Sequence, residues 1–71
     1  MKVIVSKLAG SGHSGGTAII EFWNDGKIVH EESFGGRVNS HYEREIPLSI
    51  EDFEYAECSG SVDVTFEWEL A

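Results

Sequence analysis

The sequence has little of what usually reinforces a chain of its size. Only one of the 71 residues, Cys58, is a cysteine, so no disulfide can form within the chain and a zinc ribbon is excluded. No apolar run approaches the roughly 20 residues that span a bilayer. The apolar segment 3–8 is interrupted by Ser6 and Lys7, which favours a strand over a signal sequence. We therefore expect a cytoplasmic protein with a single compact domain over residues 1–71.

Basic residues are also scarce, with five Lys and Arg against 13 Asp and Glu and a net charge of −8. The imbalance lies in residues 43–71, which hold nine acids and one base, whereas residues 1–42 hold four of each. A surface of one sign repels nucleic acid and anionic lipid, and it attracts basic proteins. The composition therefore argues against direct binding to nucleic acid or membrane and favours a basic protein as partner.

Four segments have the alternation or the β-branched content of strands, namely 2–8, 17–23, 27–34 and 61–70. The sequence Asn24-Asp25-Gly26 between the second and third predicts a hairpin. A bulged turn would pair Phe22 with Ile28, and a two-residue turn would pair Phe22 with Val29. We favour the first register because it keeps the apolar side chains on one face.

A short helix is expected over residues 50–57. Ser49 and Asp52 fit a capping box, and Gly60 lies where the helix should have ended. Three apolar residues at three-residue spacing would pack inward, namely Ile50, Phe53 and Ala56. The predicted class is therefore α+β, a mostly antiparallel sheet of about four strands with one helix on one face. The pattern leaves open whether residues 37–46 form a strand.

The glycine-rich loop 10–16 matches two catalytic patterns, G-x-G-x-x-G and G-x-S-x-G. Both patterns work only where a helix follows the loop, and residues 17–23 have β character instead. We therefore predict neither a dinucleotide site nor a nucleophile at Ser14, and no enzymatic activity. Binding of an anion by successive loop amides stays an open alternative.

Two other groups of residues carry possible chemistry. His41, Glu43 and Glu45 would face one way on a strand, as metal ligands do, but nothing in their spacing brings in a further ligand. No metal and no cofactor are predicted. Cys58 lies among acids, which oppose formation of the thiolate, so we interpret it as a small semi-buried residue.

The two tryptophans differ in their predicted surroundings. Trp68 alternates with the apolar face of the last strand and is expected in the core. Trp23 points outward if Phe22 points inward, together with Ile19 on the same face. That face is either a contact surface or is covered by the segment 35–46.

The acids of the C-terminal part fall on two predicted solvent faces, one on the helix and one on the last strand. Like charges at these separations destabilise both elements slightly, so the acids either serve solubility or meet a cationic surface. The predicted partner-binding residues are seven acids and one tryptophan, namely Glu51, Asp52, Glu54, Glu57, Asp63, Glu67, Glu69 and Trp23. The idea of a single binding surface requires the two acidic faces to be contiguous.

In size, acidity and lack of catalytic motifs the chain resembles the small inhibitors that phages make against host defence, such as anti-restriction and anti-CRISPR proteins. This resemblance covers no motif. It implies a non-enzymatic inhibitor whose carboxylates occupy the Lys/Arg groove of a nucleic-acid-binding partner in place of phosphates. The alternative is a small structural or accessory subunit that associates through the apolar surface around Ile19 and Trp23 or through an edge strand.

Overall fold

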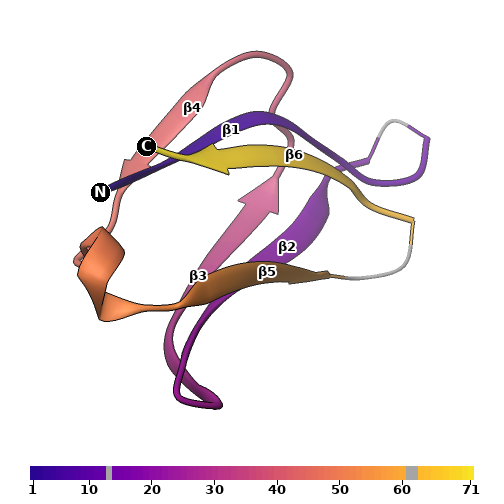
Figure 1. Ribbon diagram of the computed structural model, residues 1–71. Coiled ribbons are helices and arrows are strands. Elements are labelled where there is room, and N and C mark those ends of the chain that lie inside the picture. The colour runs from indigo at the N-terminus through magenta and orange to yellow at the C-terminus, as the bar shows by residue number, and fades with distance from the viewer. Residues whose placement is uncertain (13, 61–62) are drawn as a thin grey trace.

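The computed structural model describes residues 1–12, 14–60 and 63–71. These residues are nearly all β and form six strands and one 3-10 turn: β1 (Lys2–Ala9), β2 (Gly16–Asn24), β3 (Lys27–Gly36), β4 (Tyr42–Glu45), η1 (Ile50–Asp52), β5 (Tyr55–Gly60) and β6 (Thr65–Leu70). The strands make two antiparallel three-stranded sheets, which Figure 1 shows as two layers. The strand order is β4-β1-β6 in sheet A and β3-β2-β5 in sheet B.

The core lies between the two sheets and depends on their central strands. Six residues of β1 and β2 have no exposed surface, namely Val3, Val5, Leu8, Ala18, Ile20 and Phe22. Their alternation along each strand is what directs them all into the same layer. A bulge in β1 after Val5 shifts the alternation by one residue, so that Leu8 rather than Lys7 faces the core.

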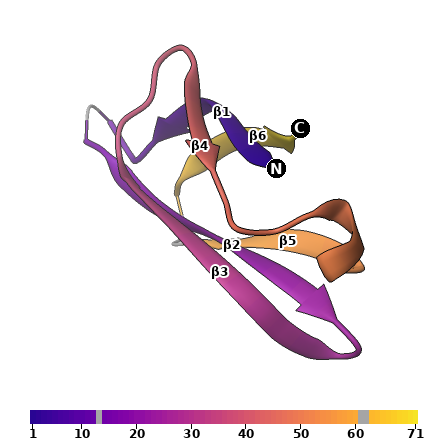
Figure 2. The same cartoon turned by 90° about the vertical axis from the view of Figure 1, so that its left-hand side faces the viewer.

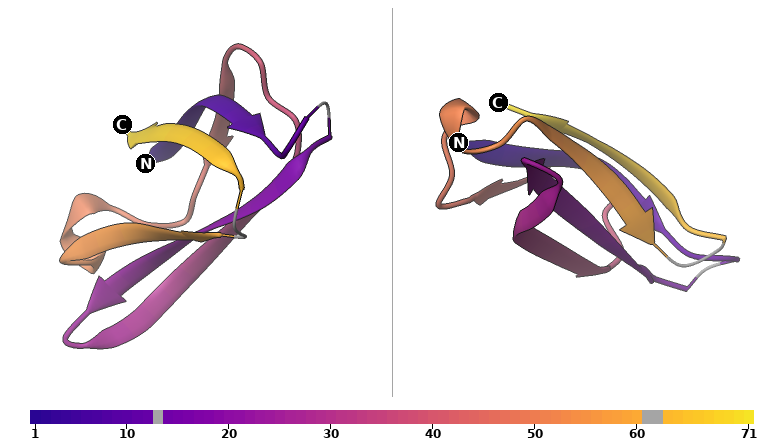
Figure 3. Two further views of the ribbon diagram at one scale, coloured as in Figure 1. Left: turned by 90° about the vertical axis from the view of Figure 1, so that its right-hand side faces the viewer. Right: turned by 60° about the horizontal axis from the view of Figure 1, so that its bottom comes forward.

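The β2–β3 hairpin projects beyond the rest of the molecule (Figures 2 and 3). Its turn consists of Asp25 and Gly26, whose φ angles of 53° and 73° are those of a two-residue type I′ turn. A bulge in β3 then aligns Phe22 with His30. The register that pairs Phe22 with Ile28 is therefore wrong, because the extra residue lies in the strand and not in the turn.

The helix expected over residues 50–57 does not form, and the predicted α+β class is wrong. The segment contains the single turn η1 and then the first three residues of β5. The predicted capping interaction is present, since the main-chain N–H of Ser49 donates to a carboxylate oxygen of Asp52 at 2.8 Å. The capping residues thus mark where the turn starts but do not determine how far it continues.

Strand β5 replaces the helix because β2 needs a partner on its second edge. The N–H of Glu54 donates to the carbonyl of Trp23 at 2.8 Å, and the pairing continues to Gly60 opposite Ala18. Main-chain polar groups of a central strand must be paired, whereas a helix of eight residues is unstable by itself. Repulsion among the acids would weaken that helix further.

The remaining segments agree more closely with expectation. The first three strands are confirmed, each with one or two additional residues. Residues 42–45 form β4, which pairs with β1 and so belongs to sheet A. The last strand begins at Thr65 and not at residue 61, and residues 61 and 62 lie outside the described residues. Within the described ranges no helix is long and apolar enough to cross a membrane.

Candidate functional site

The acids of the last two strands lie on different sheets. Glu21 alternates with the core residues Ile20 and Phe22, and Glu57 lies directly opposite it, so both lie on the outer face of sheet B. Glu67 and Glu69 alternate with the core-facing residues of β6 and lie on the outer face of sheet A. Because the buried faces of the two sheets pack together, the outer faces point in opposite directions. These acids therefore do not form one surface.

The other predicted acids lie in or beside connections. Glu51 and Asp52 belong to η1, and Asp63 lies in the connection to β6. Glu54 follows η1, and its carboxylate accepts a hydrogen bond of 2.5 Å from the N–H of Asp25 at the hairpin turn. The carboxylates of Asp52 and Glu54 thus already have structural partners.

The outer face of sheet B instead carries a row of three carboxylates, which we call the carboxylate row: Glu31, Glu21 and Glu57. Glu21 on the central strand lies directly opposite Glu31 of β3 and directly opposite Glu57 of β5. Side chains in such positions have Cβ atoms about 4.5 to 5.5 Å apart. Among the described residues of these three strands, no outward-facing side chain is Lys or Arg. The negative charge of this row is therefore not neutralised within its own face.

Beside the carboxylate row lies a second row, which we call the apolar row: Ile28, Trp23 and Tyr55. Trp23 pairs with both of the others across the sheet. The Trp23 and Tyr55 rings are stacked, with centroids 6.0 Å apart and planes within 2°. Tyr55 is 49% exposed and Ile28 is 40% exposed. The indole Nε1 of Trp23 is buried and has no hydrogen-bond partner in the described part of the chain.

The prediction that Trp23 points outward is confirmed. The segment 35–46 was the alternative cover for this face. Its strand β4 belongs to sheet A, where it pairs with β1. Trp68 packs against the core, as expected. Tyr55 is exposed and Trp23 is partly exposed, and aromatic side chains of this kind at the surface of a small domain are a common feature of protein contact surfaces.

The outer face of sheet A differs because its acids are interleaved with lysines. The Lys2 ammonium lies 3.1 Å from a Glu43 carboxylate oxygen, and Lys7 lies directly opposite Glu67. A hydrogen bond with His41 and the contact with Lys2 lower the pKa of Glu43. Glu43 and Glu67 on sheet A thus have neighbouring lysines, whereas the carboxylate row has no ion pair among the described residues.

Sequence reasoning missed Glu21, Glu31 and Tyr55. The two acids belong to the electrically neutral part of the chain, and only strand pairing brings them next to Glu57. The residues Asp25 and Gly26 predicted the hairpin, but nothing in the sequence predicted the bulge that sets its register. Tyr55 was not predicted as part of the site because residues 50–57 were expected to form a helix and not the start of β5.

The other candidate groups have simpler surroundings. The Ser14 hydroxyl donates to the carbonyl of Ser11 at 2.6 Å, and the loop leads into β2. Cys58 is exposed and not semi-buried. Burial of the thiol still raises its pKa, and a hydrogen bond with the Ile19 backbone offsets part of the rise. In the part of the chain that the structure describes, no group of three His, Cys, Asp or Glu could hold a metal ion.

The two rows on sheet B are the strongest candidate site. They combine three carboxylates that have no ion pair among the described residues with a stacked aromatic pair, in which Tyr55 is exposed and Trp23 is partly buried. Comparison with known proteins gives no family for the chain, because no family model, no curated protein and no solved structure matches it.

Proposed function

We propose that this protein is a non-enzymatic binding protein that inhibits or occupies a basic, nucleic-acid-binding partner through the outer face of sheet B. The observation that carries the proposal is the carboxylate row, in which Glu21 lies between Glu31 and Glu57. Like charges directly opposite each other destabilise a sheet, and pairs of this kind contribute roughly 0.2 to 1 kcal/mol each. A cationic partner turns this repulsion into attraction, because it supplies the charge that the face lacks.

The apolar row fits the same kind of partner. Residues two positions apart on a strand are separated by about 6.6 Å, so one long basic side chain can contact both rows. Its charged end meets a carboxylate while its stem or guanidinium plane lies on the Trp23 or Tyr55 ring. Nucleic-acid-binding grooves are rich in Lys and Arg for contact with phosphates. The carboxylates then take the place of those phosphates.

A matched pair of variants tests the proposal. One changes Glu21, Glu31 and Glu57 to Gln, and the control changes Glu51, Glu67 and Glu69 to Gln. Both raise the net charge by the same amount, but only the first removes the carboxylate row. Partners are captured from lysate of the source cells, at low and at high salt, with and without excess duplex DNA.

We expect the native chain and the control to capture a partner at low salt, and we expect added DNA or salt to release it. The carboxylate-row variant should lose most of that capture. Equal capture by both variants at both salt concentrations would rule the proposal out. Equal loss in both would show that total charge, and not this face, determines binding.

An accessory subunit that associates through its apolar surface is a second candidate. The stack of the exposed Tyr55 on the partly exposed Trp23 favours it, and β5 is an edge strand of the same sheet. This candidate predicts capture that is insensitive to salt, is retained by both Gln variants and is lost on Trp23→Ala or Tyr55→Ala. The salt dependence of capture therefore separates the two functions.

A further inference from the structure

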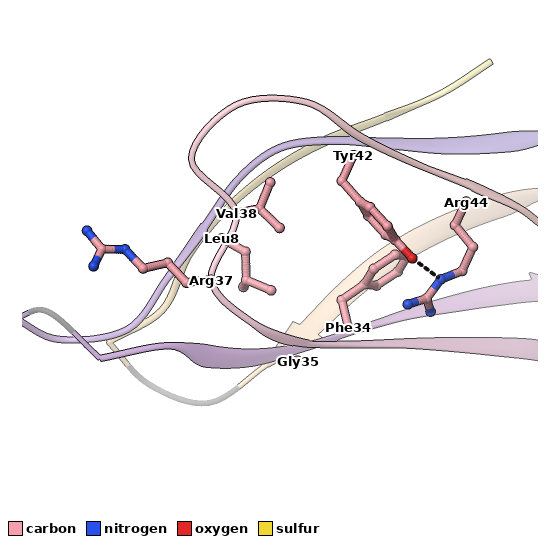
Figure 4. A pocket seen from close by; sticks show the side chains of 7 residues that line it. All are labelled: Leu8, Phe34, Gly35, Arg37, Val38, Tyr42 and Arg44. Atoms are coloured by element: carbon pink, nitrogen blue, oxygen red, sulfur yellow. Dashed lines mark hydrogen bonds between the residues drawn. The ribbon is translucent and has the colours of Figure 1, made fainter.

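A cavity of about 310 Å³ lies beside β3, under the segment that leads to β4 (Figure 4). Its volume is in the range of small-molecule sites. Seven residues line it, namely Leu8, Phe34, Gly35, Arg37, Val38, Tyr42 and Arg44. None of these residues takes part in the carboxylate row or the apolar row.

The lining has an unusual charge for this protein. Both arginines of the chain line the cavity, although the whole chain has only five Lys and Arg. None of the 13 acids is in the lining. In Figure 4 the Arg37 side chain extends away from the other six, whereas the Arg44 guanidinium lies beside the rings of Phe34 and Tyr42. Arg44, and not Arg37, is thus the cation whose charged group lies beside the aromatic rings of the lining.

The hydrogen bonds of Arg44 leave part of its guanidinium available. Its Nε–H donates to the Tyr42 hydroxyl at 3.2 Å, and its Nη1 donates to Glu32 at 3.2 Å and to the Ser33 carbonyl at 2.6 Å. A guanidinium has five N–H donors, and these bonds use three of them. The two hydrogens on Nη2 have no acceptor among the described residues. Glu32 and Ser33 hold the group in place, so the remaining donors are already oriented.

The rest of the wall is apolar and partly flat. Leu8 is fully buried, Phe34 is almost fully buried, and Val38 packs against the core. The Arg44 guanidinium carbon lies 4.1 Å from the centre of the Phe34 ring. The Phe34 and Tyr42 rings meet edge to face, with centroids 6.4 Å apart. Such walls accommodate a flat hydrocarbon body next to a group that accepts hydrogen bonds.

We propose that this cavity binds a small aromatic carboxylate. The carboxylate accepts hydrogen bonds from the Nη2 amine of Arg44, and the ring lies against Phe34, Leu8 and Val38. A carboxylate suits the site because the two Nη2 hydrogens of Arg44 have no acceptor among the described residues, although Glu32 already pairs with Nη1 from outside the lining. This ligand is distinct from the basic partner of sheet B in charge, size and contact residues.

The test compares 2-naphthoate with 2-naphthamide, which has the same rings but no charge. Each is titrated into the ¹⁵N-labelled protein, and main-chain amide shifts are followed by NMR. We expect saturable shifts at Gly35, Val38 and Tyr42 with 2-naphthoate and at least tenfold weaker binding of 2-naphthamide. Absence of saturation at millimolar 2-naphthoate, or equal affinities for the two probes, would overturn the proposal.

Two variants locate the ligand. Val38→Phe narrows the cavity and should weaken 2-naphthoate at least tenfold. Val29→Phe makes the same change on the hairpin, where the side chain is 47% exposed and outside the cavity, and should leave the affinity unchanged. Undiminished binding by a folded Val38→Phe variant, or equal loss in both, would contradict the site.

Arg44→Lys tests the contact with the carboxylate, because it keeps the charge and removes the paired donors. We expect it to weaken 2-naphthoate about tenfold and to leave 2-naphthamide nearly unaffected. Loss of both probes together would indicate a collapsed cavity and would contradict the assigned contact. The variant that lacks the carboxylate row should bind 2-naphthoate normally, so failure of this inference and failure of the proposed function are distinguishable.

Discussion

The Nη1 amine of Arg44 on β4 donates a 2.6 Å hydrogen bond to the main-chain carbonyl of Ser33 on β3. These two strands are edges of different sheets, so one side chain joins sheet A to sheet B along this flank. The same amine contacts Glu32 at 3.2 Å, and the guanidinium covers the Phe34 ring. A carbonyl that would otherwise lie unpaired at a sheet edge thereby gains a charged donor.

Replacement of Arg44 by Gln should lower the free energy of unfolding by about 1 to 3 kcal/mol. It removes a charge-assisted hydrogen bond and leaves the mostly buried Glu32 with His30 as its remaining side-chain partner among the described residues. Urea unfolding of the native and variant chains measures the effect. The double variant with Glu32→Gln should be less destabilised than the sum of the two single variants. Strict additivity would show that the two side chains are not energetically coupled.

Replacement of Glu21 by Gln should stabilise the fold by about 0.2 to 1 kcal/mol. Glu21 lies between two like charges, and the change removes both repulsive contacts at once. The gain should shrink as salt is added, because screening weakens the repulsion in the native protein. Glu69→Gln is the control, since Glu69 lies opposite Ile4. Equal effects of the two changes would argue against repulsion within the carboxylate row.

The carboxyl group of Glu43 should titrate below the usual range for glutamate. His41 lowers its pKa most, with Nε2 2.6 Å from a carboxylate oxygen, and Lys2 contributes as well. Because the folded pKa is depressed, the linked stabilisation is present above the unfolded pKa and is lost as pH falls through the folded one. Carbon-detected NMR titration measures this pKa, which His41→Asn should raise. An unchanged midpoint in the variant would remove His41 as the cause.

The Cys58 thiol should react slowly with iodoacetamide although the residue is exposed. Burial of the thiol raises its pKa, so less thiolate is present at pH 8 than for an ordinary cysteine. The alkylation rate of the folded chain should therefore be lower than that of the urea-unfolded chain and should approach it as pH rises. Equal rates at pH 8 would contradict the raised pKa.

Sequence reasoning succeeded where the signal is contained within one element. Residues 65–70 alternate perfectly between core and solvent, and Asp25-Gly26 specifies a tight turn by itself. It failed at β5, where local capping and spacing favoured a helix but the open edge of β2 determined the outcome. A propensity of a few tenths of a kcal/mol per residue cannot compete with a full row of main-chain hydrogen bonds.

The carboxylate row could not be predicted from the sequence, for a different reason. With a two-residue turn and no bulge, Glu21 would lie opposite His30, whereas the single extra residue in β3 places it opposite Glu31. One inserted residue thus changes the charge of a cross-strand pair. Separating the sequence into a neutral part and an acidic part gave no indication of this, because strands from both parts meet in sheet B.

The concentration of fully buried side chains in β1 and β2 has a consequence for how such a protein can diversify. The central strands hold the two layers together, and the peripheral strands display most of the side chains that a partner would meet. Substitutions on the outer faces of β3 and β5 can therefore accumulate without disturbing the scaffold. A combinatorial library confined to those outward positions is a direct route to versions of this chain with altered partner preference.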